Sequence, residues 1–202
     1  MRKNLITSVL YTIVTMVLLG VFYPLLMTGL AQVLFHDKAN GQLITRQGAV
    51  IGSRIIGQAF TGAGYFHSRP SAAGANGYDA TSSGGSNYAA TNKKYVDRVA
   101  GDVASLQADN PGTQVPIDLV TTSGSGLDPD ITPEAAAFQI SRVAKVRGMP
   151  VEKLKELVQR NTISRQFGLL GEPRVNVLEL NLDVDDASKH ASGPSEAAVM
   201  NR

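Results

Sequence analysis

The sequence predicts an α+β domain that one N-terminal helix anchors in a membrane. Two observations lead to this prediction. No charged residue occurs between Asn4 and Phe35, and a membrane-spanning helix needs only about 20 predominantly apolar residues. The rest of the 202-residue chain mixes short strand-like and helix-like patterns without an internal repeat. That mixture and that length are typical of a single α+β domain of ordinary size.

The composition excludes several classes of protein. With 19 basic and 17 acidic residues the net charge is +2, so the chain lacks the concentrated basic surface of a nucleic-acid binder. It has no cysteine, which excludes disulfides, thiolate metal sites and cysteine nucleophiles. Its three histidines, His36, His67 and His190, are far apart and have no carboxylate at metal-ligand spacing. We therefore expect no metal site.

The apolar run is longer than one membrane crossing requires. As a straight helix, residues 5–35 would measure about 46 Å, against a hydrocarbon core of about 30 Å. We expect the helix to tilt, to kink at Pro24 or to continue beyond the membrane as a stalk. A cleaved signal peptide is the alternative, but the apolar region of a signal peptide usually has 7–15 residues, about half as many as this run.

The charges at the two ends of the run predict its orientation. Arg2 and Lys3 precede it, whereas Lys38 follows it beside Asp37. This bias places the N-terminus in the cytoplasm and the domain outside, which in a bacterium means an inner-membrane anchor and a periplasmic domain. One helix face carries small hydroxyl residues at Ser8, Thr12 and Thr15. Such residues let another transmembrane helix pack closely, although Ser and Thr are also common and harmless in membrane spans.

The first half of the domain has four predicted elements. Residues 41–60 resemble two short strands around Gln47-Gly48. Residues 91–110 carry apolar side chains at helical spacing, and Asn110-Pro111-Gly112 ends that helix. Residues 115–120 alternate as a strand does.

The second half has clearer boundaries. Thr132 is a natural N-cap, Pro133 suits the first helical position, and Gly148 ends the helix. Pro150 begins a second helix with one apolar face. Residues 174–184 alternate as a strand whose phase changes between Val177 and Leu178, which suggests a bulge or burial on both faces. The predicted order is β-β-loop-α-β-α-α-β. We expect boundaries at 1–36 for the cytoplasmic N-terminus and anchor, 37–186 for the domain and 187–202 for a mobile tail.

A long loop over residues 64–92 consists mostly of Gly, Ala, Ser and Asn and cannot form a core of its own. A loop of this kind is either disordered or shaped by what it contacts. Within it, Arg69 and Pro70 end the compact segment Tyr65-Phe66-His67-Ser68-Arg69-Pro70. The Arg69 side chain could bind a partner's carboxylate, or it could hold the loop through bonds to backbone carbonyls of its own domain.

No stretch of the chain predicts chemistry of its own. The Gly-rich segments 82–87 and 121–130 lack the Gly-Lys-Ser/Thr of a phosphate-binding loop and the dinucleotide-binding fingerprint. Ser83 and Ser125 do not lie in the Gly-x-Ser-x-Gly context of a nucleophile elbow. Asp128-Pro129-Asp130 is best interpreted as a turn that leads into the capped helix. We therefore assign no catalytic residue and leave a nucleotide site unassigned.

Several motifs in combination resemble the KdpC family, the single-span accessory subunits of the bacterial high-affinity potassium-transporting ATPase. They are Phe66-His67-x-Arg69-Pro70-Ser71, Ser123-Gly124-Ser125-Gly126-Leu127-Asp128-Pro129 and Gly171-Glu172-Pro173-Arg174-Val175-Asn176. The resemblance runs from the apolar helix to about Asp185. It implies a complex with a channel-like potassium-translocating subunit, a P-type ATPase subunit and a small single-span subunit. ATP and K⁺ would belong to that complex, since this chain lacks the Asp-Lys-Thr-Gly motif of the ATPase subunit.

The resemblance also implies a role. The family is described as a catalytic chaperone that raises the ATP affinity of the ATPase subunit and is credited with nucleotide binding. With the domain outside, any such effect must pass through the membrane subunits as a coupling free energy.

The loop 64–92 is then expected to contact the external mouth of the channel subunit, with Tyr65, Phe66, Tyr78 and Tyr88 as anchors. His67, Arg69 and Pro70 are further interface candidates. The alternative for the loop is packing over its own domain. The alternative function is an independent membrane-anchored periplasmic binding protein or hydrolase that uses the Ser/Gly loops.

Overall fold

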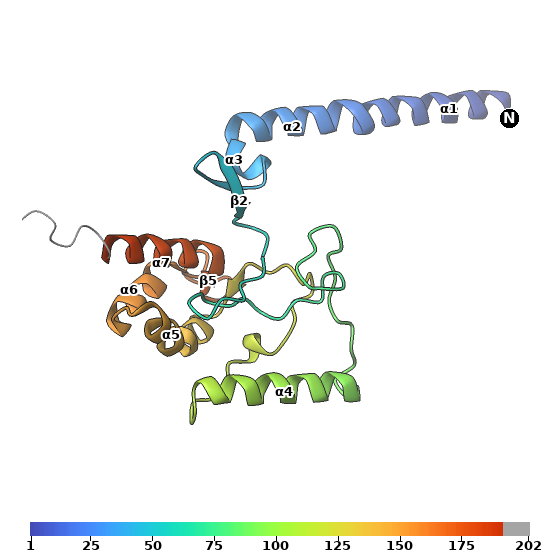
Figure 1. Cartoon of the computed structure of the whole chain (residues 1–202). Helices are drawn as coiled ribbons and strands as arrows, with labels where there is room; N and C mark the ends of the chain where they lie inside the picture. The colour runs from blue at the N-terminus through green and yellow to red at the C-terminus, as the bar shows by residue number, and fades with distance from the viewer. Residues whose placement is uncertain (192–202) are drawn as a thin grey trace, which may run out of the picture. The chain divides into compact units, whose positions relative to one another are not determined.

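The structure, a computed structural model, describes residues 1–191. It consists of two compact units that divide after Ser53, and each is described by itself below. The first contains the apolar helix and a hairpin. The second is the mixed α/β domain (Figure 1).

The apolar run forms one long helix. It comprises α1 (Arg2–Val17), a π-helical turn η1 (Leu18–Phe22) and α2 (Tyr23–Leu34), and it is long and apolar enough to span a membrane. The π turn ends two residues before Pro24. Proline has no N–H to donate, and its ring crowds the carbonyl one turn earlier, while a π turn widens the helix locally. The helix therefore passes through Pro24 instead of ending there.

A short helix α3 (His36–Ala39) and a hairpin complete the first unit. Strands β1 (Leu43–Arg46) and β2 (Ala49–Ser53) pair antiparallel. Gln47 and Gly48 form the turn, both with positive φ, at 50° and 78°, as the hairpin turns that match strand twist require. The prediction of two strands around Gln47-Gly48 is confirmed.

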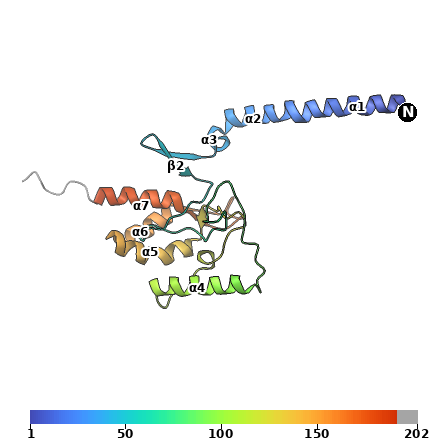
Figure 2. The ribbon, with the colours of Figure 1, turned by 45° about the vertical axis from the view of Figure 1, so that its right-hand side comes forward.

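The second unit has a small antiparallel sheet in the order β3-β5-β4, covered by helices. Its strands are β3 (Asp130–Ile131), β4 (Thr162–Ile163) and β5 (Arg174–Asn176). Its helices are α4 (Lys93–Asp109), the 3-10 turn η2 (Ile117–Leu119), α5 (Pro133–Arg147), α6 (Val151–Arg160) and α7 (Val177–Ala191). Figure 2 shows α5, α6 and α7 lying together. The core lies among these three helices and β5, and its fully buried side chains include Val143, Leu154, Val175, Leu180 and Val184.

The helix boundaries of α5 and α6 follow the sequence signals. The Thr132 hydroxyl accepts a hydrogen bond from the Ala135 amide at 3.1 Å, and Gly148 ends α5 in the left-handed conformation with φ 63°. Helix α6 begins directly after Pro150. Both helices confirm the prediction, because capping residues and proline act locally and do not depend on the rest of the fold.

The predicted strand over residues 174–184 is wrong beyond Asn176. Residues from Val177 to Ala191 form α7. Its buried residues Val177, Leu178, Leu180, Asn181 and Val184 repeat as one face of a helix does, and this repeat produced the apparent change of phase. Asn176 Oδ1 accepts from the Glu179 amide at 3.1 Å and so caps the helix start. The sequence signal was an N-cap Asn with Glu three residues later, a variant of the capping box.

Two further expectations need correction. Residues 117–119 form a 3-10 turn, so the strand expected over 115–120 is absent from this described segment. Helix α7 also extends to Ala191, past the expected domain end at 186, and the expected mobile tail otherwise lies outside the described residues. Helix α4 forms at the expected place, but it has no buried residue.

Candidate functional site

The part of the chain that the structure describes contains no group of three or more His, Cys, Asp or Glu side chains that could hold a metal ion. The candidate functional region is therefore the loop 64–92 and the surfaces around it. The structure shows in detail what gives this loop its shape.

Two arginines of α5 hold the start of the loop. Arg142 Nη1 donates to the carbonyls of Ala63 and Tyr65, and Arg147 Nε donates to the carbonyl of Gly64 at 2.8 Å. The Arg147 guanidinium lies 4.4 Å from the centre of the Tyr65 ring and forms an ion pair with Asp185 at 2.8 Å. The Tyr65 hydroxyl donates to the same carboxylate at 3.2 Å. Tyr65, predicted as an anchor for a partner, is thus bound within its own domain.

Two buried amides pair with the backbone of consecutive loop residues. Asn181 of α7 accepts from the Phe66 amide at 2.8 Å and donates to the Phe66 carbonyl at 2.9 Å. Gln139 of α5 does the same for His67, at 2.7 and 3.1 Å. Each side chain replaces the strand partner that the loop backbone lacks, which satisfies polar groups that are otherwise costly to bury. We call Gln139 and Asn181 the amide pair.

Phe66 itself belongs to the core. Its side chain is 0% exposed and packs among the buried residues of α5, α6 and α7. The interpretation of Phe66 as an exposed anchor is therefore wrong. A large aromatic side chain in a Gly-rich loop suggests an exposed residue, whereas Phe66 fastens the loop to the core.

Arg69 holds the loop to a second Gly-rich segment. Its Nη1 forms an ion pair with Asp128 at 3.1 Å, and its Nε and Nη2 donate to Thr121 at 3.4 Å. The Arg69 carbonyl, next to Pro70, accepts from the Tyr78 hydroxyl. Of the two roles left open for Arg69, the structure shows the intramolecular one.

Glycine permits the closest approach between the two segments. Ser71 Oγ donates to the Gly126 carbonyl at 2.6 Å, and the Gly84 amide donates to the Ser125 carbonyl at 2.8 Å. Gly126 has φ 67°, and a Cβ there would lie 2.6 Å from the Gly84 carbonyl oxygen. The Ser/Gly segments therefore pack against each other. The loop 64–92 is shaped by its own domain, which was the alternative in the sequence analysis.

The remaining aromatic and histidine candidates differ in exposure. Tyr88 is 46% exposed. Tyr78 is partly buried, and burial raises the pKa of its hydroxyl. His67 is partly buried, with its Nε2 3.1 Å from the Gly62 carbonyl. Burial, followed by the nearby Arg142 charge, lowers the pKa of His67 below its ordinary value of 6.5. An imidazole that stays neutral near pH 7 fits a structural role at this position.

The Asp-Pro-Asp turn also has a structural role. Asp128 Oδ1 accepts from the Asp130 amide at 3.1 Å, as an Asx turn requires. Asp130 lies 2.8 Å from Arg174 and 3.1 Å from the Asn176 amide nitrogen. Burial raises the pKa of Asp130, and the bonds from Asn176 and Arg174 oppose that rise. Asp118 accepts from the Thr132 amide at 2.7 Å at the start of α5.

The hydroxyl face of the apolar helix is satisfied internally. Ser8, Thr12 and Thr15 donate to the carbonyls one turn earlier, at 2.8–2.9 Å. Because these hydroxyl groups already have acceptors within the helix, they need no hydrogen-bond partner on another helix. Helix docking at this face stays a prediction that rests on small side-chain size alone.

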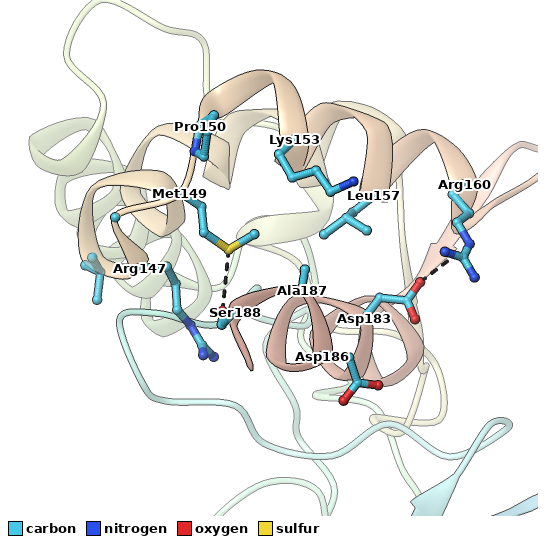
Figure 3. Close-up of a pocket in the computed structure, with 12 residues that line it drawn as sticks. Arg147, Met149, Pro150, Lys153, Leu157, Arg160, Asp183, Asp186, Ala187 and Ser188 are labelled. Atoms are coloured by element: carbon cyan, nitrogen blue, oxygen red, sulfur yellow. Dashed lines mark hydrogen bonds and ion pairs between the residues drawn. The ribbon is translucent and has the colours of Figure 1, made fainter. Parts of the chain in front are cut away.

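A groove that the sequence did not reveal lies between the α5–α6 corner and α7 (Figure 3). It has a volume of about 900 Å³. Met149, Pro150, Lys153 and Leu157 line it from the α5–α6 side, and Asp186 lines it from α7. Because residues 177–191 were predicted as a strand and a tail, the α7 wall of this groove could not be foreseen.

Comparison with known proteins identifies the family of this chain. A family model described as KdpC, K⁺-transporting ATPase c chain, matches residues 5–186. A potassium-transporting ATPase KdpC subunit from Koribacter versatilis is 65% identical over 185 residues, covering 92% of this chain and 95% of the relative. The corresponding subunit from Acidobacterium capsulatum is 60% identical, covering 91% and 98%. That from Gemmatimonas aurantiaca is 50% identical, covering 98% and 100%.

Proposed function

Because this chain belongs to the KdpC family of K⁺-transporting ATPase c chains, we propose that it is the membrane-anchored accessory subunit that stabilises this ATPase. Its partners are the other subunits of the complex: the channel-like potassium-translocating subunit, the P-type ATPase subunit and the small single-span subunit. ATP hydrolysis and K⁺ movement belong to those partners.

One observation carries the proposal. The polar side chains that could have formed a reaction centre instead hold the loop 64–92 in one shape. The amide pair is bonded to Phe66 and His67, and Arg69 is bonded to Asp128 and Thr121. A loop fixed before binding loses little entropy when it docks. A small loss of entropy on docking is expected of a permanent subunit that offers a rigid surface.

The anchor tethers the domain to the membrane. We propose that the N-terminus, with Arg2 and Lys3, lies in the cytoplasm and that the domain lies in the periplasm. The helix Arg2–Leu34 would then run among the transmembrane helices of the other subunits. Its hydroxyl face at Ser8, Thr12 and Thr15 is the proposed contact.

The effect on ATP is proposed to be indirect. If the domain lies outside, it cannot meet ATP, and it acts as a catalytic chaperone only by favouring one conformation of the membrane subunits. A coupling of this kind typically changes affinity by a factor of about 5–150.

The test compares the purified complex with and without this chain. We expect the complex without it to need a higher ATP concentration for half-maximal hydrolysis, and the isolated chain to hydrolyse no ATP. An unchanged ATP dependence in a fully assembled complex would refute the chaperone role. ATP hydrolysis by the isolated chain would refute the accessory role.

The alternative of an independent periplasmic hydrolase gains no support from the Ser/Gly loops. Ser83 Oγ donates to the Ser125 carbonyl, and Ser125 Oγ accepts from the Leu127 amide. No general base is bonded to either hydroxyl in these contacts, so we do not propose this function.

A further inference from the structure

The outer part of the β4–β5 hairpin exposes apolar side chains that the domain does not cover. Phe167 is 96% exposed, Leu169 77% and Leu170 57%. They lie together at the end of the hairpin, whose backbone is closed by a bridge between Gln166 and Leu170. We call residues 166–170 the hairpin tip. Grouped apolar side chains on a surface mark interaction sites, whereas scattered ones do not.

The backbone of the hairpin tip disfavours phenylalanine. Phe167 and Gly168 have φ angles of 54° and 73°, and the Leu169 amide donates to the Gln166 carbonyl at 3.1 Å. Tight hairpin turns with two positive φ angles strongly prefer Asn-Gly, because bulky residues seldom adopt the left-handed conformation. Folding alone therefore does not explain Phe167. Strained residues of this kind point to a function.

The backbone amides of the hairpin tip already have hydrogen-bond acceptors within the hairpin. The amides of Gln166, Gly168, Leu169 and Leu170 all donate to carbonyls within the hairpin, at 2.9–3.1 Å. Removing these groups from water therefore leaves no unsatisfied donor among them.

The charges around the hairpin tip favour a protein over a lipid surface. Arg165 forms an ion pair with Glu172, and Arg174 forms one with Asp130. Attraction to anionic headgroups depends on clustered basic residues, and here each arginine of the hairpin faces a carboxylate of its own domain. A neutral surround with an apolar centre matches the organisation of a protein interface.

From these observations we propose that the hairpin tip inserts Phe167 into an apolar pocket of another subunit of the K⁺-transporting ATPase, with Leu169 and Leu170 closing around it. This inference rests on the proposed function, since it requires the complex. It goes beyond that function by naming the residues that dock. A single buried aromatic of this kind often carries much of the energy of an interface.

The first test replaces Phe167 with the residue that the turn prefers. In Phe167→Asn the chain should fold at least as stably as the wild type, because Asn adopts positive φ readily. Association with the other subunits in detergent should weaken at least about tenfold, as for a hot-spot residue. Ile117→Asn is the matched control, since Ile117 is 74% exposed but lies outside the hairpin; it should leave association unchanged.

The outcomes separate this inference from the proposed function. If the wild-type chain recovers no companion subunits, the proposed function fails. If the wild type recovers them and Phe167→Asn recovers them equally, the docking role of the hairpin tip is overturned. An equal loss in Ile117→Asn would also overturn it, because any new surface asparagine would then suffice.

A second variant identifies what the hairpin tip contacts. The chain has no cysteine, so Phe167→Cys carries the only thiol and accepts a thiol-linked photocrosslinker. In the assembled complex, a crosslink to a different subunit supports the proposal. Crosslinks only to lipid, or only to a second copy of this chain, overturn it. This readout holds even if Phe167→Asn alters folding.

Discussion

Replacing Asn181 by Leu tests whether the amide pair gives the loop 64–92 its shape. Leu has the same branched arrangement of heavy atoms as Asn but cannot hydrogen-bond, and the Asn181 side chain is 1% exposed. The change leaves the Phe66 N–H and C=O without their partners at 2.8 and 2.9 Å. Both groups would remain buried beside the Phe66 ring, which is 0% exposed.

The magnitude follows from the two orphaned groups. Leaving one buried polar group unsatisfied costs about 1–3 kcal/mol, so Asn181→Leu should lower the free energy of unfolding by about 2–6 kcal/mol. At roughly 4 °C per kcal/mol for a domain of this size, the melting temperature should fall by roughly 8–24 °C.

Circular dichroism of the full chain in detergent measures this change. The matched control is Gln107→Leu, because Gln107 is an exposed residue of α4; surface changes of this kind usually stay within about 0.5 kcal/mol. Hydrogen exchange should also show faster exchange of the Phe66 amide in Asn181→Leu. A melting temperature within about 3 °C of the wild type, with the Phe66 amide still protected, would refute the role of the amide pair.

The other predictions concern two side chains of the loop, the orientation of the anchor and its hydroxyl face. Arg69→Ala should lower the free energy of unfolding by about 1–2 kcal/mol, since its bonds to Asp128 and Thr121 are only partly buried; thermal unfolding measures this, and an unchanged melting temperature together with failed assembly would restore the interface role. Burial lowers the pKa of His67 in the folded chain below 6.5, so the unfolded chain binds the proton more readily and stability should fall as the pH drops from about 6.5 towards the folded pKa. In His67→Gln this pH dependence of stability should be weaker. Unfolding measured against pH tests this, and the same slope in wild type and variant would contradict it. A periplasm-active reporter fused after Asp185 should be active and a cytoplasmic one inactive; the reverse would refute the orientation. Changing the hydroxyl face of the helix to Leu should keep membrane insertion but reduce recovery of the complex, and unchanged recovery would make that face incidental; its residues are Ser8, Thr12 and Thr15.

Local signals were sufficient for several elements. The turn at Gln47-Gly48 and the cap at Thr132 act on their immediate neighbours, and both were predicted. Helix α4 was also predicted, with its end at Asn110, although its cap Asn92 was not. The absence of buried residues in α4 was not predicted, because helical spacing shows which side chains share a face and not whether another element covers that face.

The misses have different physical causes. In residues 174–184 a helix face with buried Asn181 imitated a strand, since short apolar runs fit either period. The role of Asn181 could not be predicted because its partner Phe66 lies 115 positions away in the sequence. The hairpin tip could not be predicted because Phe167 has a positive φ, which is the opposite of the local preference of phenylalanine.

Affinity purification of the tagged full-length chain in mild detergent, from cells grown at low potassium, tests the central claim most directly. We expect the chain to elute in fixed stoichiometry with the other subunits and native mass spectrometry to give the mass of one defined complex. The same sample should hydrolyse ATP in response to K⁺. If the chain elutes alone as a monomer from cells that contain the other subunits, it is not a subunit of this ATPase and the proposed function is refuted.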